Sequence, residues 1–148
     1  MPPFTAQDPD YQTRVRRSFG EQRVMSAFGA SLGDVEPGAV DVVLPFRDDL
    51  TQQDGFLHAG IVAAIADSAC GYAAYTLMPP TARVLSIEFK LNLLAPAVGE
   101  RLIARARVLR AGRTITVCRA DVSAVIGRDE KLVATMLGTM MTVTTTPS

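Results

Sequence analysis

Residues 55–75 of this chain read GFLHAGIVAAIADSACGYAAY, the longest stretch with strong helix-forming chemistry. Apolar residues cover nearly every side of the predicted helix, which is typical of a buried helix rather than a surface one. Two ionisable side chains interrupt the apolar run, His58 at its start and Asp67 in its middle. A charged carboxylate is costly to bury among Ala, Ile and Cys, so Asp67 requires an explanation.

His58 is the single histidine of the chain, and it precedes Asp67 by nine positions. At about 100° per residue, the two side chains point to opposite sides of one straight helix. A His–Asp dyad within one helix is therefore disfavoured. We expect that a site using both residues takes them from two copies of the chain.

Small residues surround Asp67 on its own face of the predicted helix. The positions three and four residues away from it hold Ala63, Ala64, Cys70 and Gly71. This spacing leaves free volume beside the carboxylate. It fits either a tight contact between helix and sheet or room for a substrate, and spacing alone does not separate the two.

The composition predicts one ordinary globular domain over residues 1–148, with 48% apolar and 20% charged residues. Fifteen basic and fifteen acidic residues give no net charge, which disfavours a nucleic-acid-binding protein that relies on bulk electrostatics. Cys70 and Cys118 lie in apolar surroundings and are predicted to be reduced, buried thiols. One histidine and no cysteine cluster predict no metal site. The N-terminus lacks signal-peptide chemistry and no apolar run is long enough to span a membrane, so we expect a cytoplasmic protein.

The rest of the chain predicts strands around the central helix, preceded by an N-terminal helical extension over about residues 1–24 with an amphipathic helix at 8–20. We expect the central helix to end near Leu77, before two prolines. Short turns predict antiparallel neighbours, and the fold class is α+β, with a long antiparallel sheet wrapped around one helix. The expected strands are 25–32, 39–46, 84–94, 100–109, 114–126 and 131–145.

The last predicted strand carries apolar residues on both of its faces. One face is expected to meet the central helix, and the other then needs a second partner, which predicts a homo-oligomer. The first face consists of Leu132, Ala134, Met136 and Met140, and the second of Val133, Leu137, Met141 and Val143.

This arrangement resembles the hotdog fold, and its motifs resemble those of the PaaI-type acyl-CoA thioesterases from about Ser26 onward. The family pattern places an Asn and a Gly before His-Gly-Gly at the helix start, and an Asp nine residues after the His. Gly55, His58, Gly60 and Asp67 match that pattern. Ser86 and the sequence APAVGE at 95–100 match a later strand of the family. The chain departs from the pattern at two positions, Gln52 for the Asn and Ala59 for the first Gly.

The resemblance implies a role for each of these residues in thioester hydrolysis. Asp67 would be the general base or nucleophile, acting on a thioester bound at the helix start of the neighbouring subunit. The backbone N–H groups of Ala59 and Gly60 would hold the oxyanion. Ser86 would place the water, and Gln52 would stand near the carbonyl. For His58, a loop-capping role and direct substrate contact stay open.

Coenzyme A would enter as part of the substrate, and no cofactor is expected. Its phosphates need basic partners, for which the resemblance favours Arg113, followed by Arg83 and Lys90, although each is also an ordinary surface charge. An acyl tunnel would use residues that equally suit core packing. These are Gly55, Phe56 and Leu57 at the helix start, and Tyr72 and Tyr75 farther along the helix.

The sequence thus predicts an acyl-CoA thioesterase, active as a dimer and assembled as a tetramer in the family that it resembles. A hotdog protein that binds acyl-CoA without cleaving it, as a sensor or carrier, is the alternative. A hotdog dehydratase or hydratase is a weaker third reading, since those families space His and carboxylate differently. The acyl group, and the choice between CoA and acyl-carrier-protein esters, stay open.

Overall fold

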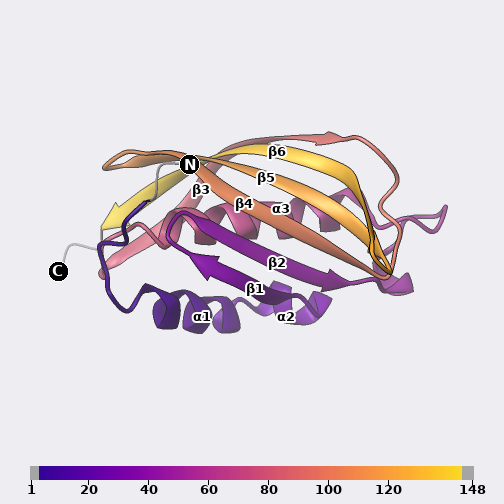
Figure 1. Cartoon of the computed structure of the whole chain (residues 1–148), viewed down its shortest axis with the longest axis horizontal. Coiled ribbons are helices and arrows are strands. Elements are labelled where there is room, and N and C mark those ends of the chain that lie inside the picture. The colour runs from indigo at the N-terminus through magenta and orange to yellow at the C-terminus, as the bar shows by residue number, and fades with distance from the viewer. Residues whose placement is uncertain (1–3, 145–148) are drawn as a thin grey trace.

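The computed structural model describes residues 4–144, which form one curled antiparallel sheet around a long helix (Figure 1). The chain begins with two short helices, continues through a β-hairpin and a 3₁₀ turn into the long helix, and ends with four long strands. The elements are α1 (Tyr11–Glu21), α2 (Arg23–Phe28), β1 (Ser31–Glu36), β2 (Ala39–Pro45), η1 (Asp48–Leu50), α3 (Ala59–Tyr75), β3 (Ala82–Leu93), β4 (Arg101–Ala111), β5 (Ile115–Ile126) and β6 (Asp129–Thr144).

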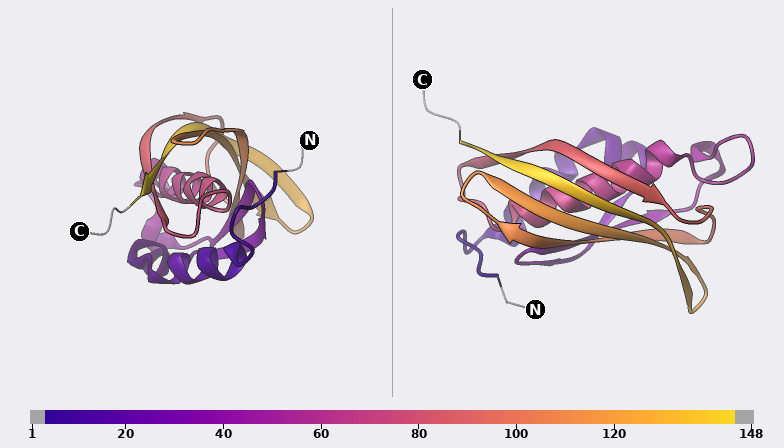
Figure 2. Two further views of the ribbon diagram at one scale, coloured as in Figure 1. Left: turned by 90° about the vertical axis from the view of Figure 1, so that its left-hand side faces the viewer. Right: turned by 90° about the horizontal axis from the view of Figure 1, so that it is seen from above.

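The sheet has the strand order β1-β2-β4-β5-β6-β3, and all its pairs are antiparallel. Seen end-on, it curls around α3, while α1 lies along the side that the sheet leaves open (Figure 2). Helix α3 contacts every strand from β2 to β6, so most of its side chains are buried. Strand β3 follows α3 in the chain but pairs only with β6, which leaves it at an edge of the sheet.

The structure corrects the prediction of a strand over residues 25–32. This segment forms helix α2, and β1 begins only at Ser31. Met25 and Phe28 are three positions apart and pack on one face of α2, a spacing that a short apolar run does not distinguish from strand alternation. Gly29 ends the helix with a φ of 78°, a left-handed conformation that favours glycine.

The last strand follows the predicted two-faced pattern except near its start. Ala134, Met136 and Met140 are buried against the core, whereas Leu132 is 43% exposed. Val122 and Ser123 of β5 pair with Ala134 and Leu132 of β6, so a β-bulge leaves Val133 without a partner in the ladder. The bulge reverses the alternation of buried and exposed side chains along β6 at this point. Val133 therefore points inward instead. Thr145, the predicted end of the strand, and residues 1–3 of the predicted extension lie outside the described residues.

Arg14 attaches α1 to the end of α3. Its guanidinium donates hydrogen bonds to the main-chain oxygens of Tyr75, Met78 and Pro79. These carbonyls lie at and just beyond the last turn of α3. The Tyr75 and Pro79 carbonyls also accept from the backbone N–H groups of Met78 and Ala82, whereas Arg14 is the donor to the Met78 carbonyl. Arg14 is buried, forms an ion pair with Asp8 at 3.3 Å, and lies 4.4 Å from the centroid of the Tyr75 ring. The N-terminal helix is thus fixed to the same helix that carries Asp67.

We predict that Arg14→Met lowers the free energy of unfolding by about 2–4 kcal/mol, because it leaves the Met78 carbonyl without its donor and the buried Asp8 carboxylate without its cation. Urea denaturation followed by circular dichroism measures the change. Arg17→Met is the matched control, since Arg17 is exposed on the same helix. Equal effects of the two substitutions would contradict the anchoring role of Arg14.

Candidate active site

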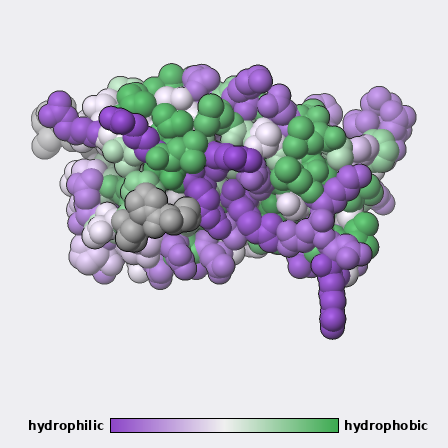
Figure 3. All heavy atoms as spheres, turned by 45° about the horizontal axis from the view of Figure 1, so that its top comes forward, coloured by the Kyte–Doolittle hydropathy of each residue, from purple (hydrophilic) through white to green (hydrophobic). Residues whose placement is uncertain are grey.

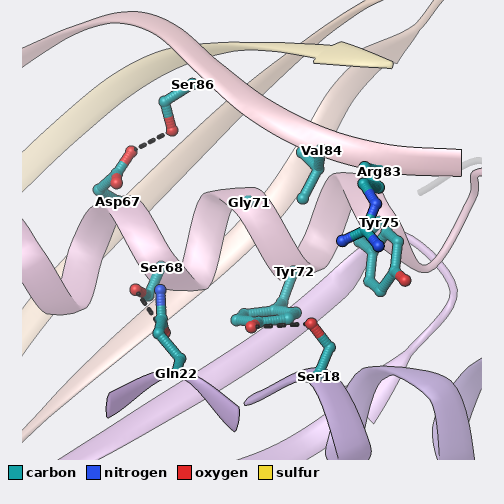
Figure 4. Close-up of a pocket in the computed structure, with 10 residues that line it drawn as sticks. All are labelled: Ser18, Gln22, Asp67, Ser68, Gly71, Tyr72, Tyr75, Arg83, Val84 and Ser86. Carbon is teal, nitrogen blue, oxygen red and sulfur yellow. Dashed lines mark hydrogen bonds between the residues drawn. The ribbon is translucent and has the colours of Figure 1, made fainter. Parts of the chain in front are cut away.

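Asp67 lies in the middle of α3, opposite the edge strand β3 (Figure 4). The Ser86 hydroxyl donates a hydrogen bond of 2.6 Å to its Oδ1 atom. The other carboxylate oxygen has no partner among residues 4–144, so it is available to accept a proton or a further hydrogen bond. The structure therefore brings together the two residues that the sequence assigned to the reacting water.

A cavity of about 210 Å³ opens beside this carboxylate. Helix α3, strand β3 and the α1–α2 segment form its walls (Figure 4). Gly71 lies one turn beyond Asp67 on the lining face, and a Cβ atom placed on it would meet nothing within 4 Å. The small residues around Asp67 were compatible with a tight contact between helix and sheet or with open space. On the Gly71 side of the helix, the structure shows open space.

Cys70 is the other group near Asp67 that could act as a nucleophile. Its thiol is fully buried. Hydrogen bonding with Cys118 and burial raise the pKa of the Cys70 thiol far above its ordinary value. Because the thiolate is the reactive form, this cysteine is inert, and Asp67 stays the predicted reactive group, now shown to line the cavity.

The start of α3 is capped by the side chain of His58. Its Nδ1 atom accepts a hydrogen bond of 2.8 Å from the Gly60 backbone N–H. A Cβ atom on Gly60 would lie 3.0 Å from that nitrogen, so a larger residue at this position would crowd the imidazole that caps the helix. The N–H groups of Ile61 and Val62 donate to the His58 carbonyl.

This cap affects the two predicted oxyanion donors, the backbone N–H groups of Ala59 and Gly60, differently. The Gly60 N–H is engaged by His58, whereas the Ala59 N–H has no partner among residues 4–144. In the described conformation Ala59 is therefore the backbone donor available at the positive end of α3. His58 acts as the capping residue that the sequence allowed, and a contact between it and substrate stays a prediction.

The loop before α3 forms a second wall at the helix start. Thr51 and Leu57 pair across it as an antiparallel bridge, and Gly55 supports the turn with a φ of 84°. The Gln52 side-chain oxygen accepts from the N–H groups of Asp54 and Phe56. Its amide nitrogen has no partner among residues 4–144. Gln52 thus stabilises the loop and keeps a donor free.

A second cavity, of about 370 Å³, opens at this helix start. Gln52, Phe56, Leu57 and Ala59 line it, together with apolar residues of the loop after β3. Eight residues separate Ala59 from Asp67, which is about 12 Å along the helix axis. One chain therefore holds the two halves of the predicted site in separate cavities.

The three predicted basic residues do not lie together. Arg83 lines the Asp67 cavity. Arg113 lines a third cavity near the end of α3, together with Leu77 and Thr142. Lys90 is exposed on β3 opposite Leu137 and lines none of these cavities. Their predicted role at the coenzyme phosphates stays a prediction.

Four residues of the Asp67 cavity were missed from the sequence: Ser68 and Val84, which neighbour predicted residues, and Ser18 and Gln22 of the N-terminal helices. Ser68 donates to the Gln22 side-chain oxygen at 3.2 Å, and the Ser18 and Tyr72 hydroxyls are 3.2 Å apart. The signal of Ser18 and Gln22 in the sequence was weak, because a polar residue on a short amphipathic helix is normally solvated. Tyr72 is buried, as its core-packing reading required, and also lines the cavity. Burial raises the pKa of its hydroxyl.

Within residues 4–144, no group of three or more His, Cys, Asp or Glu side chains is placed to hold a metal ion. In the same part of the chain, no helix combines the length and the apolar composition needed to cross a membrane.

Comparison with protein families matches residues 54–131 to the model described as "Thioesterase superfamily". A Halobacterium salinarum protein named "Putative esterase" is 32% identical over 132 residues, which cover 85% of this chain and 85% of that protein. The matched segment includes α3, the Asp67–Ser86 pair and most of the strands that surround them.

Solved structures agree with these matches. A thioesterase family protein from Silicibacter pomeroyi is similar with a TM-score of 0.90 and 48% identity, over 91% of this chain and 99% of that chain. The Escherichia coli PaaI protein has a TM-score of 0.82 at 17% identity, over 90% of this chain and 94% of its own. The hotdog fold and the resemblance stated from the sequence are both confirmed.

We predict that Gly71→Ala raises the free energy of unfolding by about 0.5–1 kcal/mol, because alanine favours the helix and its methyl group enters open space. Thermal and urea denaturation measure the change. Gly138→Ala is the contrasting variant, since its Cβ would lie 3.2 Å from Met140 Cε, and it should be destabilising. A destabilised Gly71→Ala protein would show that the space beside Asp67 is filled.

Proposed function

Because the chain belongs to the thioesterase superfamily, we propose that it hydrolyses acyl-CoA thioesters to a free acid and CoA, with Asp67 as the reacting carboxylate. The observation that carries this proposal is the Asp67–Ser86 hydrogen bond at the edge of an open cavity. A carboxylate with one oxygen oriented by a hydroxyl and the other unpartnered is suited to general-base or nucleophilic catalysis.

In the general-base form of the proposal, Asp67 accepts a proton from a water that Ser86 helps to place. The water oxygen attacks the thioester carbon, and the carbonyl oxygen becomes an oxyanion that accepts a hydrogen bond from the Ala59 N–H. The C–S bond then breaks and the proton passes from Asp67 to the sulfur of CoA. In the nucleophilic form, Asp67 attacks the carbon itself, the C–S bond breaks and the CoA thiolate leaves. Water then hydrolyses the mixed anhydride, which releases the acid and restores the Asp67 carboxylate, and the proton that water loses passes to the CoA thiolate.

We propose that a homodimer is the minimal active unit, with Asp67 from one subunit and Ala59 from the other. The separation of about 12 Å along one helix supports this, because it is too large for both groups to reach one carbonyl group. The Gln52 amide donor lies on the Ala59 side of the site. It would reach the same oxyanion from the partner's helix start.

The surface offers contacts for such an assembly. Strand β3 is an edge with one unpaired side, and Leu85, Ile87 and Phe89 are 60%, 51% and 44% exposed along it. Unpaired edges with apolar side chains favour pairing with another chain. Apolar residues also interrupt the polar outer face of the sheet (Figure 3), where Leu137 and Met141 are exposed. This second surface supports a tetramer built from two dimers.

The state of the two cysteines bears on the cellular compartment of the protein. Cys70 and Cys118 are free thiols, both fully buried. Unpaired cysteines are usual in reducing compartments, which supports the cytoplasmic location expected from the sequence. CoA is part of the substrate in this proposal, and no cofactor is assigned.

A protein that binds acyl-CoA without cleaving it is the second candidate. The observation that favours it is the cap at the helix start, which leaves one unpartnered backbone donor where two were expected. Hydrolysis and binding are separated by a thiol-release assay run beside calorimetric titration. Tight binding without thiol release on any CoA ester would favour this candidate and contradict the hydrolase.

We predict that Asp67→Asn lowers kcat for acyl-CoA hydrolysis by about 10²–10⁴-fold, because it removes the proton acceptor. Ser86→Ala should lose less, since the carboxylate remains. Asp34→Asn is the control, because Asp34 is exposed on β1 and lines none of the three cavities described. Circular dichroism checks folding, and full activity of the Asp67 variant would overturn its assignment.

We predict that Ala59→Pro lowers kcat by about 10²–10³-fold by removing one N–H. The fold should tolerate it, because proline is favoured at the first helical position and His58 already has the extended ψ of 139° that precedes proline. Ala59→Gly retains the N–H and should exceed the proline variant by that factor. Equal rates of the two would exclude an oxyanion role for this group.

Mixing the two inactive variants tests the shared site. After co-refolding Asp67→Asn with Ala59→Pro, each mixed dimer has one intact site and one site with both defects. We therefore expect activity to reappear on mixing. If Asp67 and Ala59 of the same subunit worked together, every site would stay defective and no activity would return.

A further inference from the structure

The Asp67 cavity extends from the carboxylate toward the far end of α3, and its lining is mostly polar. Tyr72, Tyr75 and Arg83 lie along it beyond Asp67, with Arg83 and Tyr75 at the end farthest from the carboxylate (Figure 4). Val84 is the aliphatic side chain of the lining. Whatever occupies the cavity beyond the reacting carbon therefore meets polar groups along most of its length.

The α1–α2 segment closes the base of this cavity. Gln22 lies at the junction of the two helices with a ψ of 95°, outside the helical range, which directs its side chain toward α3. Its oxygen accepts from the Ser68 hydroxyl, and Ser18 pairs with the Tyr72 hydroxyl. Ser68 and Tyr72 are buried, so this base is held by internal hydrogen bonds.

Hydrogen-bond donors outnumber acceptors in this part of the cavity. The Gln22 amide nitrogen, the Tyr75 hydroxyl and the Arg83 guanidinium have no partner among residues 4–144, whereas the Gln22 oxygen is already used by Ser68. The Tyr75 ring is held between Arg14, 4.4 Å from its centroid, and an edge contact with Tyr72. Asp67 is the acidic residue of the lining, and it lies at the opposite end from Arg83.

An apolar acyl chain would cover these donors without satisfying them, which is unfavourable. A carboxylate is an acceptor with no proton to donate, and it carries the charge that complements a guanidinium. Resting on the proposed thioesterase activity, we propose that the preferred substrates are CoA monothioesters of short dicarboxylic acids. Arg83 and the Tyr75 hydroxyl, at the end of the cavity away from Asp67, bind the distal carboxylate of the acyl group.

The spacing along β3 agrees with this assignment. Arg83 precedes Ser86 by three positions, about 10 Å of strand, and its side chain extends beside the Tyr75 ring (Figure 4). This assignment takes Arg83 away from the coenzyme phosphates. The two roles differ in a measurable way, because a phosphate contact acts on every CoA ester and a carboxylate contact acts on dicarboxylic esters alone.

The test compares esters of equal carbon number in the purified full-length chain: glutaryl-CoA with pentanoyl-CoA, and adipyl-CoA with hexanoyl-CoA. We expect kcat/KM to be higher for the dicarboxylic ester in each pair. We also expect Arg83→Met to reduce that ratio by about 10–100-fold. Tyr75→Phe should reduce it less, and Arg128→Met, on the exposed β5–β6 turn, is the charge-matched control.

Two further arms identify what Arg83 recognises. N-acetylcysteamine thioesters of the same acids lack the coenzyme nucleotide, so the effect of Arg83→Met should persist on them if the acyl carboxylate is the target. The monomethyl ester of adipyl-CoA removes the charge and retains the length, and it should be cleaved like hexanoyl-CoA.

Each contrary outcome has a distinct meaning. Equal loss on dicarboxylic and monocarboxylic CoA esters, with no loss on N-acetylcysteamine esters, would overturn the inference and assign Arg83 to the coenzyme. Hydrolysis of pentanoyl-CoA without preference for glutaryl-CoA would overturn the inference and leave the thioesterase proposal intact. Failure to cleave any thioester would instead overturn the proposed function.

Discussion

The hydrogen bond from the Ser86 hydroxyl to the Asp67 carboxylate joins the edge strand β3 to the middle of α3. A sheet that curls around a helix normally excludes everything else from between them, because protein interiors are closely packed. Here the small side chains beside Asp67, with Gly71 foremost, keep a cavity open at this contact. The packing that buries α3 elsewhere also holds the carboxylate in place at the cavity wall.

The N-terminal helices belong to this site as well as to the fold. Arg14 secures α1 to the end of α3, and Ser18 and Gln22 then face Tyr72 and Ser68 across the base of the cavity. The matched thioesterase model begins after this segment, at residue 54. Ser18 and Gln22, which form the base of the cavity, therefore lie outside the part of the chain that matches the family model.

The sequence was sufficient to predict an element where a single hydrophobic periodicity or a clear turn motif dominated the segment. The long apolar helix, the four C-terminal strands and the Asp67 face could be predicted, and the family pattern added Ser86, which no local spacing connects to Asp67. It failed where tertiary contacts decide. The apolar run at 25–32 fits helix and strand alike, and the bulge at Val133 depends on the strand beside it. The cap on Gly60 requires a side-chain conformation of His58 that no pattern encodes.

Strand β3 presents its free edge close to the Asp67 carboxylate, and each chain keeps this carboxylate and the Ala59 N–H about 12 Å apart along the helix axis. Under the proposed arrangement, an isolated chain would be folded but would lack the partner's half of the active site. Mass action then governs the turnover per chain, which declines on dilution once dimers dissociate. Cellular abundance of the protein would act as a control on its own specific activity, with no effector involved.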